Sequence, residues 1–366
     1  MRENRSWWQR TKSTFLGGLV KSTIAEDSLP SHDKINTPVE PLDMLAKLSQ
    51  YFLLLGEPNL QLSPRWLADR LETTERELLD TMAYALRDGI VELRWEVFCS
   101  SCGGAAETFA SLTHAKSQID CLGCESMFEL HLDRNVNVTF SASERFRRER
   151  GDEPVLMPSN SLEFAPTKGL DLLLIPSFHK LFSGETPSVN ESLRIGYVTV
   201  LFTDLRGSTA MYAERGDTQA YKMVREHFDI LTDEIERNRG VFIKTIGDSV
   251  MASFAKGADA INTVFESQSA LRARTAEMGG ELVLKAGIHA GACLAVNLNN
   301  SLDFFGTVVN TAARLEGLSH GNDVIVSDVV FEEAKKEITQ FCTVEDIDAQ
   351  LRGLADTVHI RRLSAC

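Results

Sequence analysis

The stretch YVTVLFTDLRGST, residues 197–209, contains a β-rich run that leads at once into a turn and a helix. Its first seven residues are mostly β-branched or aromatic, as strand residues are, and they end at Asp204. The turn Gly207-Ser208-Thr209 follows, and a long helical pattern begins behind it. A carboxylate at a strand end, beside a glycine turn and a helix N-terminus, suits a metal-bound polyphosphate. The stretch therefore predicts a strand–turn–helix unit with a candidate phosphate site.

A second stretch, residues 241–254 (VFIKTIGDSVMASF), predicts a β-hairpin with Gly247-Asp248 at its turn. Asp248 would then lie at the hairpin tip, where it could meet Asp204 across neighbouring strands. An aspartate in such a turn often serves the turn alone. The two carboxylates become a candidate metal site only if they belong to one constellation.

A third stretch, residues 303–314 (DFFGTVVNTAAR), completes a set that resembles the class III nucleotide cyclase catalytic domain. Lys244 would be a solvated strand residue if taken alone, Asp303 a loop residue, and Asn310 and Arg314 part of an exposed helix face. All three motifs occur in the order and spacing of the family. The resemblance covers about residues 195–363, and it implies an α+β, ferredoxin-like catalytic domain over residues 195–366.

The resemblance implies that Asp204 and Asp248 hold two Mg2+ or Mn2+ ions, with the Leu205 carbonyl as a further ligand. One ion would acidify the ribose 3'-hydroxyl for attack on the α-phosphate, and the other would hold the β- and γ-phosphates. The backbone N–H groups of Gly207, Ser208 and Thr209 would cradle the triphosphate.

Lys244 and Asp303 occupy the base-reading positions of the family. A lysine can donate to adenine N1 and an aspartate can accept from the 6-amino group, whereas guanine presents the reverse pattern, so the pair favours ATP over GTP. Asn310 and Arg314 are spaced i, i+4 on one helix face, where the family uses them to support the transition state. Arg352 matches a phosphate-contacting lysine of the family.

In this family the site lies between two cyclase domains, and this chain carries one domain with the full residue set. The resemblance therefore implies a symmetric homodimer that makes cyclic AMP and pyrophosphate from ATP. The stretch between His289 and Asp303 is short for the family, which predicts a reduced dimerisation arm. The alternatives are a cyclase for another nucleotide and a degenerate cyclase-fold dimerisation module.

Four cysteines form two CxxC knuckles, Cys99/Cys102 and Cys121/Cys124, with 18 residues between them. This spacing is typical of a zinc ribbon with four thiolate ligands and no open position, so the zinc would be structural. The alternative is four buried thiols without metal. The other cysteines (Cys293, Cys342 and Cys366) are isolated, as is usual in a reducing compartment.

The region from residue 41 to 98 has a helical pattern followed by a strand and resembles a winged helix. Leucines recur every three or four residues over 42–55, Pro64 can open a second helix, and Thr74 with Glu77 has capping-box spacing for a third. That third helix is acidic, which favours a packing or dimerisation module over a DNA reader. Residues 99–182 are expected to hold the zinc ribbon and further strands, and residues 183–194, with SGETPS at 183–188, have linker composition.

Composition limits the partners. The 366 residues carry a net charge of −14, which argues against generic nucleic-acid binding. No apolar stretch approaches the roughly 18 residues of a membrane span, so a cytoplasmic location is expected. Residues 1–40 are interpreted as a flexible basic arm. Membrane-surface contact by residues 1–21, which interleave arginines with Trp7 and Trp8, is the less favoured alternative.

Overall fold

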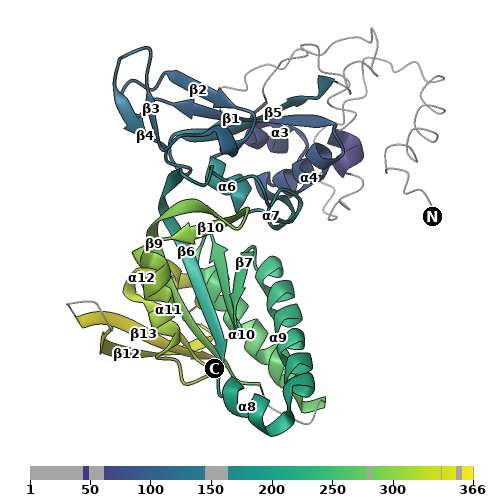
Figure 1. Ribbon diagram of the computed structural model, residues 1–366, viewed down its shortest axis with the longest axis vertical. Helices are drawn as coiled ribbons and strands as arrows, with labels where there is room; N and C mark the ends of the chain where they lie inside the picture. The colour runs from purple at the N-terminus through teal and green to yellow at the C-terminus, as the bar shows by residue number, and fades with distance from the viewer. Residues whose placement is uncertain are drawn as a thin grey trace, which may run out of the picture.

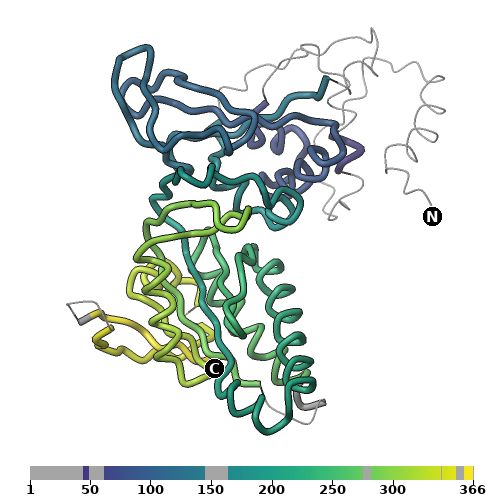
Figure 2. The backbone as a smooth tube through the Cα atoms, viewed as in Figure 1, coloured from purple at the N-terminus to yellow at the C-terminus, as the bar shows by residue number. Residues whose placement is uncertain are grey.

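The computed structural model describes residues 44–48, 62–144, 164–277, 282–338, 340–351 and 357–365. The predicted basic arm, Arg352 and Cys366 lie outside these ranges. The described chain forms an N-terminal region that carries the cysteine knuckles and a larger C-terminal region, stacked along the long axis of the molecule (Figures 1 and 2).

The N-terminal region begins with helices and continues with short strands. Its elements are α3 (Pro64–Arg70), α4 (Glu75–Arg87), β1 (Val91–Phe98), β2 (Ala105–Phe109), η1 (Leu112–His114), β3 (Gln118–Asp120), β4 (Met127–Glu129), β5 (Val136–Ala142), α6 (Gly169–Leu173) and α7 (Pro176–Leu181). Strands β2, β1 and β5 form an antiparallel sheet in that order, and β3 pairs with β4. Residues 44–48 are also helical.

Local sequence signals mark where the helices of the N-terminal region begin and end. The capping box at the start of α4 is confirmed, because the Thr74 side chain accepts from the Glu77 N–H and the Glu77 carboxylate accepts from the Thr74 N–H. Pro64 occupies the first turn of α3. Gly89, with φ of 70°, ends the turn after α4 and leads into β1.

The C-terminal region is an eight-stranded sheet with helices on both faces. Its elements are β6 (Ser192–Leu205), α8 (Ser208–Arg215), α9 (Asp217–Arg237), β7 (Val241–Ile246), β8 (Ser249–Phe254), α10 (Gly257–Glu277), β9 (Leu284–Leu298), β10 (Ser301–Phe305), α11 (Thr307–Glu316), β11 (Val324–Ser327), α12 (Asp328–Ile338), β12 (Cys342–Gln350) and β13 (Thr357–Ala365). The strand order is β12-β13-β11-β9-β6-β8-β7, with β10 beside β9.

The four strands at one end of this order, β9-β6-β8-β7, and the helices α9 and α10 give a β-α-β-β-α-β unit. This confirms the α+β class expected for the C-terminal region. The predicted hairpin of residues 241–254 is also confirmed as β7 and β8. The first strand is longer than predicted, because β6 begins at Ser192 rather than at Tyr197.

The two faces of the sheet bury different helices. Leu201 and Leu205 of β6 face the core that α9, α10 and α12 form. Val200 and Phe202 face the other way and pack with Ala312 of α11. Because side chains alternate along a strand, Asp204 lies on the α11 face.

The N-terminal and C-terminal regions share one hydrophobic core. A single buried cluster includes Trp95 and Phe178 from the first region and Phe202 and Phe304 from the second. The backbone of Arg194 at the start of β6 also donates to Leu130 O at 3.0 Å and accepts from Leu132 N at 2.9 Å. The two regions are therefore joined by packing and by main-chain hydrogen bonds.

The segment with linker composition is packed between the two regions. Thr186 is fully buried, and its hydroxyl accepts from Asn297 Nδ2 of β9 at 2.7 Å. Strands β9 and β10 form a hairpin over the stretch from His289 to Asp303, with Asn299 and Asn300 at positive φ in its turn.

Among the residues that the structure describes, no helix combines the length and the apolar character that crossing a membrane requires.

Candidate active site

Asp204 and Asp248 come from neighbouring strands that end at the same edge of the sheet. Asp204 is the penultimate residue of β6, and Asp248 follows Gly247 in the turn between β7 and β8. Strands β6 and β8 pair up to Thr203 and Val250. The Ser249 hydroxyl, next to Asp248, donates to Asp204 Oδ1 at 2.8 Å, so the structure brings the two predicted metal residues together.

These carboxylates fit a divalent cation. Within the described part of the chain, Asp248 Oδ2 is buried and has no hydrogen-bond partner. A buried charged oxygen without a partner is costly, and a hard cation such as Mg2+ or Mn2+ prefers such an oxygen as ligand. The pair therefore has the donor chemistry that the predicted metal ions need.

The turn after Asp204 leaves a helix N-terminus open. Gly207 adopts a left-handed conformation with φ of 73° and no side chain caps α8. Thr209 is exposed and Ser208 is half-buried. Free N–H groups at a helix start attract anions, and the triphosphate contact of residues 207–209 stays a prediction.

Lys244 and Asp303 form an ion pair, although they lie 59 positions apart in the sequence. Lys244 Nζ donates to Asp303 Oδ2 at 2.5 Å. Asp303, only 5% exposed, also accepts the Phe304 N–H on Oδ1 at 2.8 Å. The backbone and the lysine thus fix the carboxylate, and a lysine with three N–H groups keeps donors for a ligand.

Asn310 and Arg314 lie on α11, and neither side chain has a hydrogen bond or ion pair with another described residue. Asn310 is exposed and Arg314 is half-buried. An unpaired guanidinium is available to an anionic group from outside the domain.

One protomer holds these residues in separate groups. Lys244 precedes Asp248 by four residues, or about 13 Å of strand. The base-reading pair therefore lies along β7 from Asp248, and we call it and the metal carboxylates the two half-sites of the chain.

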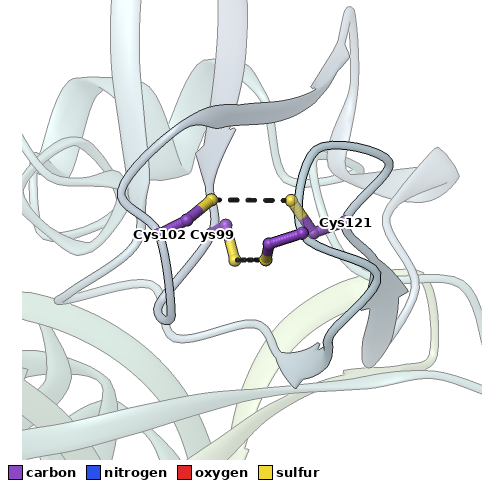
Figure 3. A group of neighbouring side chains, drawn as sticks. Cys99, Cys102 and Cys121 are labelled. Carbon is purple, nitrogen blue, oxygen red and sulfur yellow. Dashed lines mark hydrogen bonds between the residues drawn. The ribbon is translucent and has the colours of Figure 1, made fainter.

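The four knuckle cysteines converge on one point of the N-terminal region (Figure 3). Their sulfur atoms all lie within 4.8 Å of one another. Cys99 Sγ is 3.7 Å from Cys124 Sγ, and Cys102 Sγ is 3.8 Å from Cys121 Sγ. Four sulfurs at about 2.3 Å from a zinc ion form a tetrahedron with edges of about 3.8 Å, so the cluster fits the predicted zinc.

The Ser126 hydroxyl adds to this fit. It lies 3.4 Å from Cys99 Sγ and 3.1 Å from Cys124 Sγ. Its hydrogen bonds have the largest effect among those that lower the pKa of the Cys99 thiol to about 5 and also lower the pKa of Cys124. The pKa of the Cys102 thiol is raised to about 11 instead. At Cys99 and Cys124 the lowered pKa favours the thiolate, which is the form that binds zinc.

A second ion pair lies beside the carboxylates, and no sequence motif predicts it. Lys285 of β9 is the direct strand partner of Asp204, and its ammonium bonds to Glu316 Oε1 of α11 at 2.7 Å. Burial raises the pKa of Glu316 most, the Lys285 ammonium lowers it, and the charges of Asp204 and Asp248 raise it further. Only a known strand register could have placed Lys285 next to Asp204.

Two family models match parts of the chain. Residues 191–360 match the adenylate and guanylate cyclase catalytic domain. Residues 62–164 match a family of unknown function, DUF5939. The cysteine cluster lies within this second match.

Curated relatives match less than half of this chain. An adenylate cyclase of Mycosarcoma maydis is 29% identical over 160 residues, which are 38% of this chain and 6% of that protein. Adenylate cyclase 2 of Rhizobium meliloti (strain 1021) is 26% identical over 180 residues, which are 45% of this chain and 49% of that protein. The chain thus spans less than half of the length of either relative.

A crystal structure of the adenylyl cyclase CyaB from P. aeruginosa is also similar. It is 21% identical, with a TM-score of 0.43, over 48% of this chain and 97% of that chain.

Proposed function

From the match of residues 191–360 to the adenylate and guanylate cyclase catalytic domain, we propose that this chain is an adenylate cyclase. It would convert ATP to cyclic AMP and pyrophosphate as a homodimer. The observation that carries the proposal is the Lys244–Asp303 ion pair, built into the same domain as the carboxylates Asp204 and Asp248.

The base-reading pair accounts for the choice of ATP. Lysine can only donate and an ionised aspartate can only accept. Adenine offers an acceptor at N1 and a donor at its 6-amino group, which these two side chains complement. Guanine offers a donor and an acceptor in the reverse order, so the alignment of the base against Lys244 and Asp303 decides between the two nucleotides.

The other half-site accounts for the chemistry. Asp204 and Asp248, with the Leu205 carbonyl, would hold two Mg2+ or Mn2+ ions, which supply positive charge at the phosphates and activate the ribose 3'-hydroxyl. The N–H groups of residues 207–209 would bind the triphosphate. Asn310 and Arg314 would stabilise the charge that develops at the α-phosphate.

The homodimer is proposed from the resemblance to the cyclase family, in which the site lies between two domains. Each protomer would combine its own carboxylates with residues of a second copy, namely its base-reading pair and also its Asn310 and Arg314. This arrangement gives two equivalent sites. The cysteine cluster would hold a structural zinc ion, because all four tetrahedral positions are filled by sulfur.

The test is cyclisation of ATP, GTP, CTP and UTP by the purified full-length protein with Mn2+. We expect cyclic AMP as the main product of the wild type, reduced or replaced by another cyclic nucleotide in Lys244→Glu. Asp204→Ala should abolish every product. If a confirmed dimer forms no cyclic nucleotide from any substrate, the degenerate dimerisation module becomes the better reading.

A further inference from the structure

The ion pair between Lys285 and Glu316 lies beside the proposed metal site, yet neither residue belongs to the cyclase motifs described above. Lys285 is directly opposite Asp204 in the β6–β9 ladder. The side chains of such opposed residues lie on the same face, with their Cβ atoms about 4.5–5.5 Å apart. The Lys285 ammonium is therefore within reach of the Asp204 carboxylate.

The ammonium bonds elsewhere in the structure. Lys285 Nζ donates to Glu316 Oε1 at 2.7 Å, and both side chains are largely buried, with 18% and 16% exposed. Asp204 Oδ1 instead accepts from the Ser249 hydroxyl. Glu316 thus takes the ammonium that lies opposite Asp204 in the strand pair.

Close packing of α11 against Gly287 of β9 keeps Glu316 next to Lys285. A Cβ at this position would lie 2.0 Å from the Glu316 backbone nitrogen and 2.5 Å from the Ala312 carbonyl oxygen. The last turn of α11 therefore lies directly on the β9 backbone. Gly287 is two residues after Lys285 and so faces the same side of the sheet. The contact of α11 with Gly287 therefore places Glu316 beside the lysine.

The position of Glu316 near both metal carboxylates has electrostatic support. The negative charges of Asp204 and Asp248 act on the Glu316 carboxyl and raise its pKa, in addition to the larger effect of burial. The four groups are therefore close enough to interact through the protein interior.

We propose that Glu316 is a positioning residue of the metal site, which holds the Lys285 ammonium away from Asp204 and so keeps both aspartates available to cations. The inference rests on the proposed function, because it takes Asp204 and Asp248 as the metal ligands. Without Glu316, Lys285 would be left with Asp204 as the nearest carboxylate and would compete with the metal ion.

The test is direct binding of Mn2+ to the full-length protein, measured by the loss of the free Mn2+ signal in electron paramagnetic resonance. The titration is made without nucleotide and with an ATP analogue that cannot cyclise. We expect Glu316→Gln to raise the Mn2+ dissociation constant by about 10- to 100-fold, as is typical when a supporting partner of a metal ligand is lost.

The double variant Lys285→Met/Glu316→Gln separates this role from a structural one. It removes the competing ammonium together with its partner, so the Mn2+ affinity should return close to the wild-type value. A purely structural role of the ion pair predicts instead that the double variant binds Mn2+ no better than the single one, and this result would overturn the proposal.

Two further variants complete the design. Glu226→Gln breaks an ion pair with Arg274, between α9 and α10 on the opposite face of the sheet, and should leave Mn2+ binding unchanged. Asp204→Ala should abolish it. If Asp204→Ala binds Mn2+ as the wild type does, the proposed metal site itself is wrong. If Asp204→Ala loses binding while Glu316→Gln does not, only the role of Glu316 is wrong.

Discussion

At the scale of single residues, His227 of α9 makes the stability of the folded protein depend on pH. The side chain is fully buried, and burial lowers the pKa of its imidazole from 6.5 to about 4, against a weaker opposing effect of the Asp248 charge. The unfolded chain therefore binds a proton at a higher pH than the native protein does. Between these two pKa values, stability falls as the pH falls.

We expect the free energy of unfolding to contain a contribution from His227 that drops by about 2 kcal/mol between pH 7.5 and pH 5. Urea unfolding at the two pH values measures it, and His227→Leu should have a smaller difference than the wild type. His114→Leu, at an exposed position, is the control. Equal pH dependence in His227→Leu and the wild type would contradict the assignment.

The residue scale also shows how far the sequence could predict the site. Motif order led to Lys244 and Asp303, and the structure pairs them. Lys285 and Glu316 were missed, because their roles follow from strand register and from the contact of α11 with Gly287. Neither the strand register nor this helix contact can be recognised from a local sequence pattern.

At the scale of elements, the contact of α11 with β9 depends on one glycine. Gly287→Ala would place a methyl group 2.0 Å from a backbone nitrogen, which forces the helix away from the strand. We expect a loss of about 1–3 kcal/mol of stability and a lower kcat, because the same helix carries Asn310 and Arg314. Thermal unfolding and a cyclase assay measure the two effects.

Gly291→Ala is the matched control for this prediction. It lies on the same strand and faces the same helix, but its Cβ would come no closer than 3.7 Å to Val308. This variant should keep both its stability and its activity. If Gly287→Ala behaves in the same way, the close packing of α11 on β9 is not required.

The cysteine knuckles are a second element with a separate test. We expect one zinc ion per chain in the purified protein by elemental analysis, and its loss in Cys121→Ser together with a lower unfolding temperature, because structural zinc contributes folding energy. Cys293→Ser, outside the cluster, should retain the zinc. A wild-type protein without zinc, purified free of chelators, would contradict the prediction.

Elements with strong local signals were predicted well. The capping box of Thr74 and Glu77 starts α4, and the Gly247-Asp248 turn joins β7 to β8. The start of β6 was placed five residues late, because Ser192–Gly196 has no strong strand pattern. These residues pair with β9 and with the N-terminal region, and such pairing partners lie far away in the sequence.

At the scale of the whole molecule, the two half-sites make a prediction about assembly. Asp204→Ala and Arg314→Ala should each be inactive alone. If each site combines residues of two copies, mixing the variants lets half of the dimers contain one of each chain, and one of the two sites in these dimers is intact. Random pairing thus restores about a quarter of wild-type activity. Activity of the mixture no higher than that of the single variants would argue against a shared site.

The hydrophobic core that the two regions share has a consequence for attempts to produce one region without the other. The linker composition of residues 183–194 suggests a cut near residue 190 to isolate the C-terminal region. Such a fragment would expose Leu193 and Ile195, and it would leave the Arg194 backbone without its partners at Leu130 and Leu132. We therefore expect the fragment to aggregate and the intact chain to remain in solution. The C-terminal region therefore relies on the N-terminal region to cover part of its apolar surface.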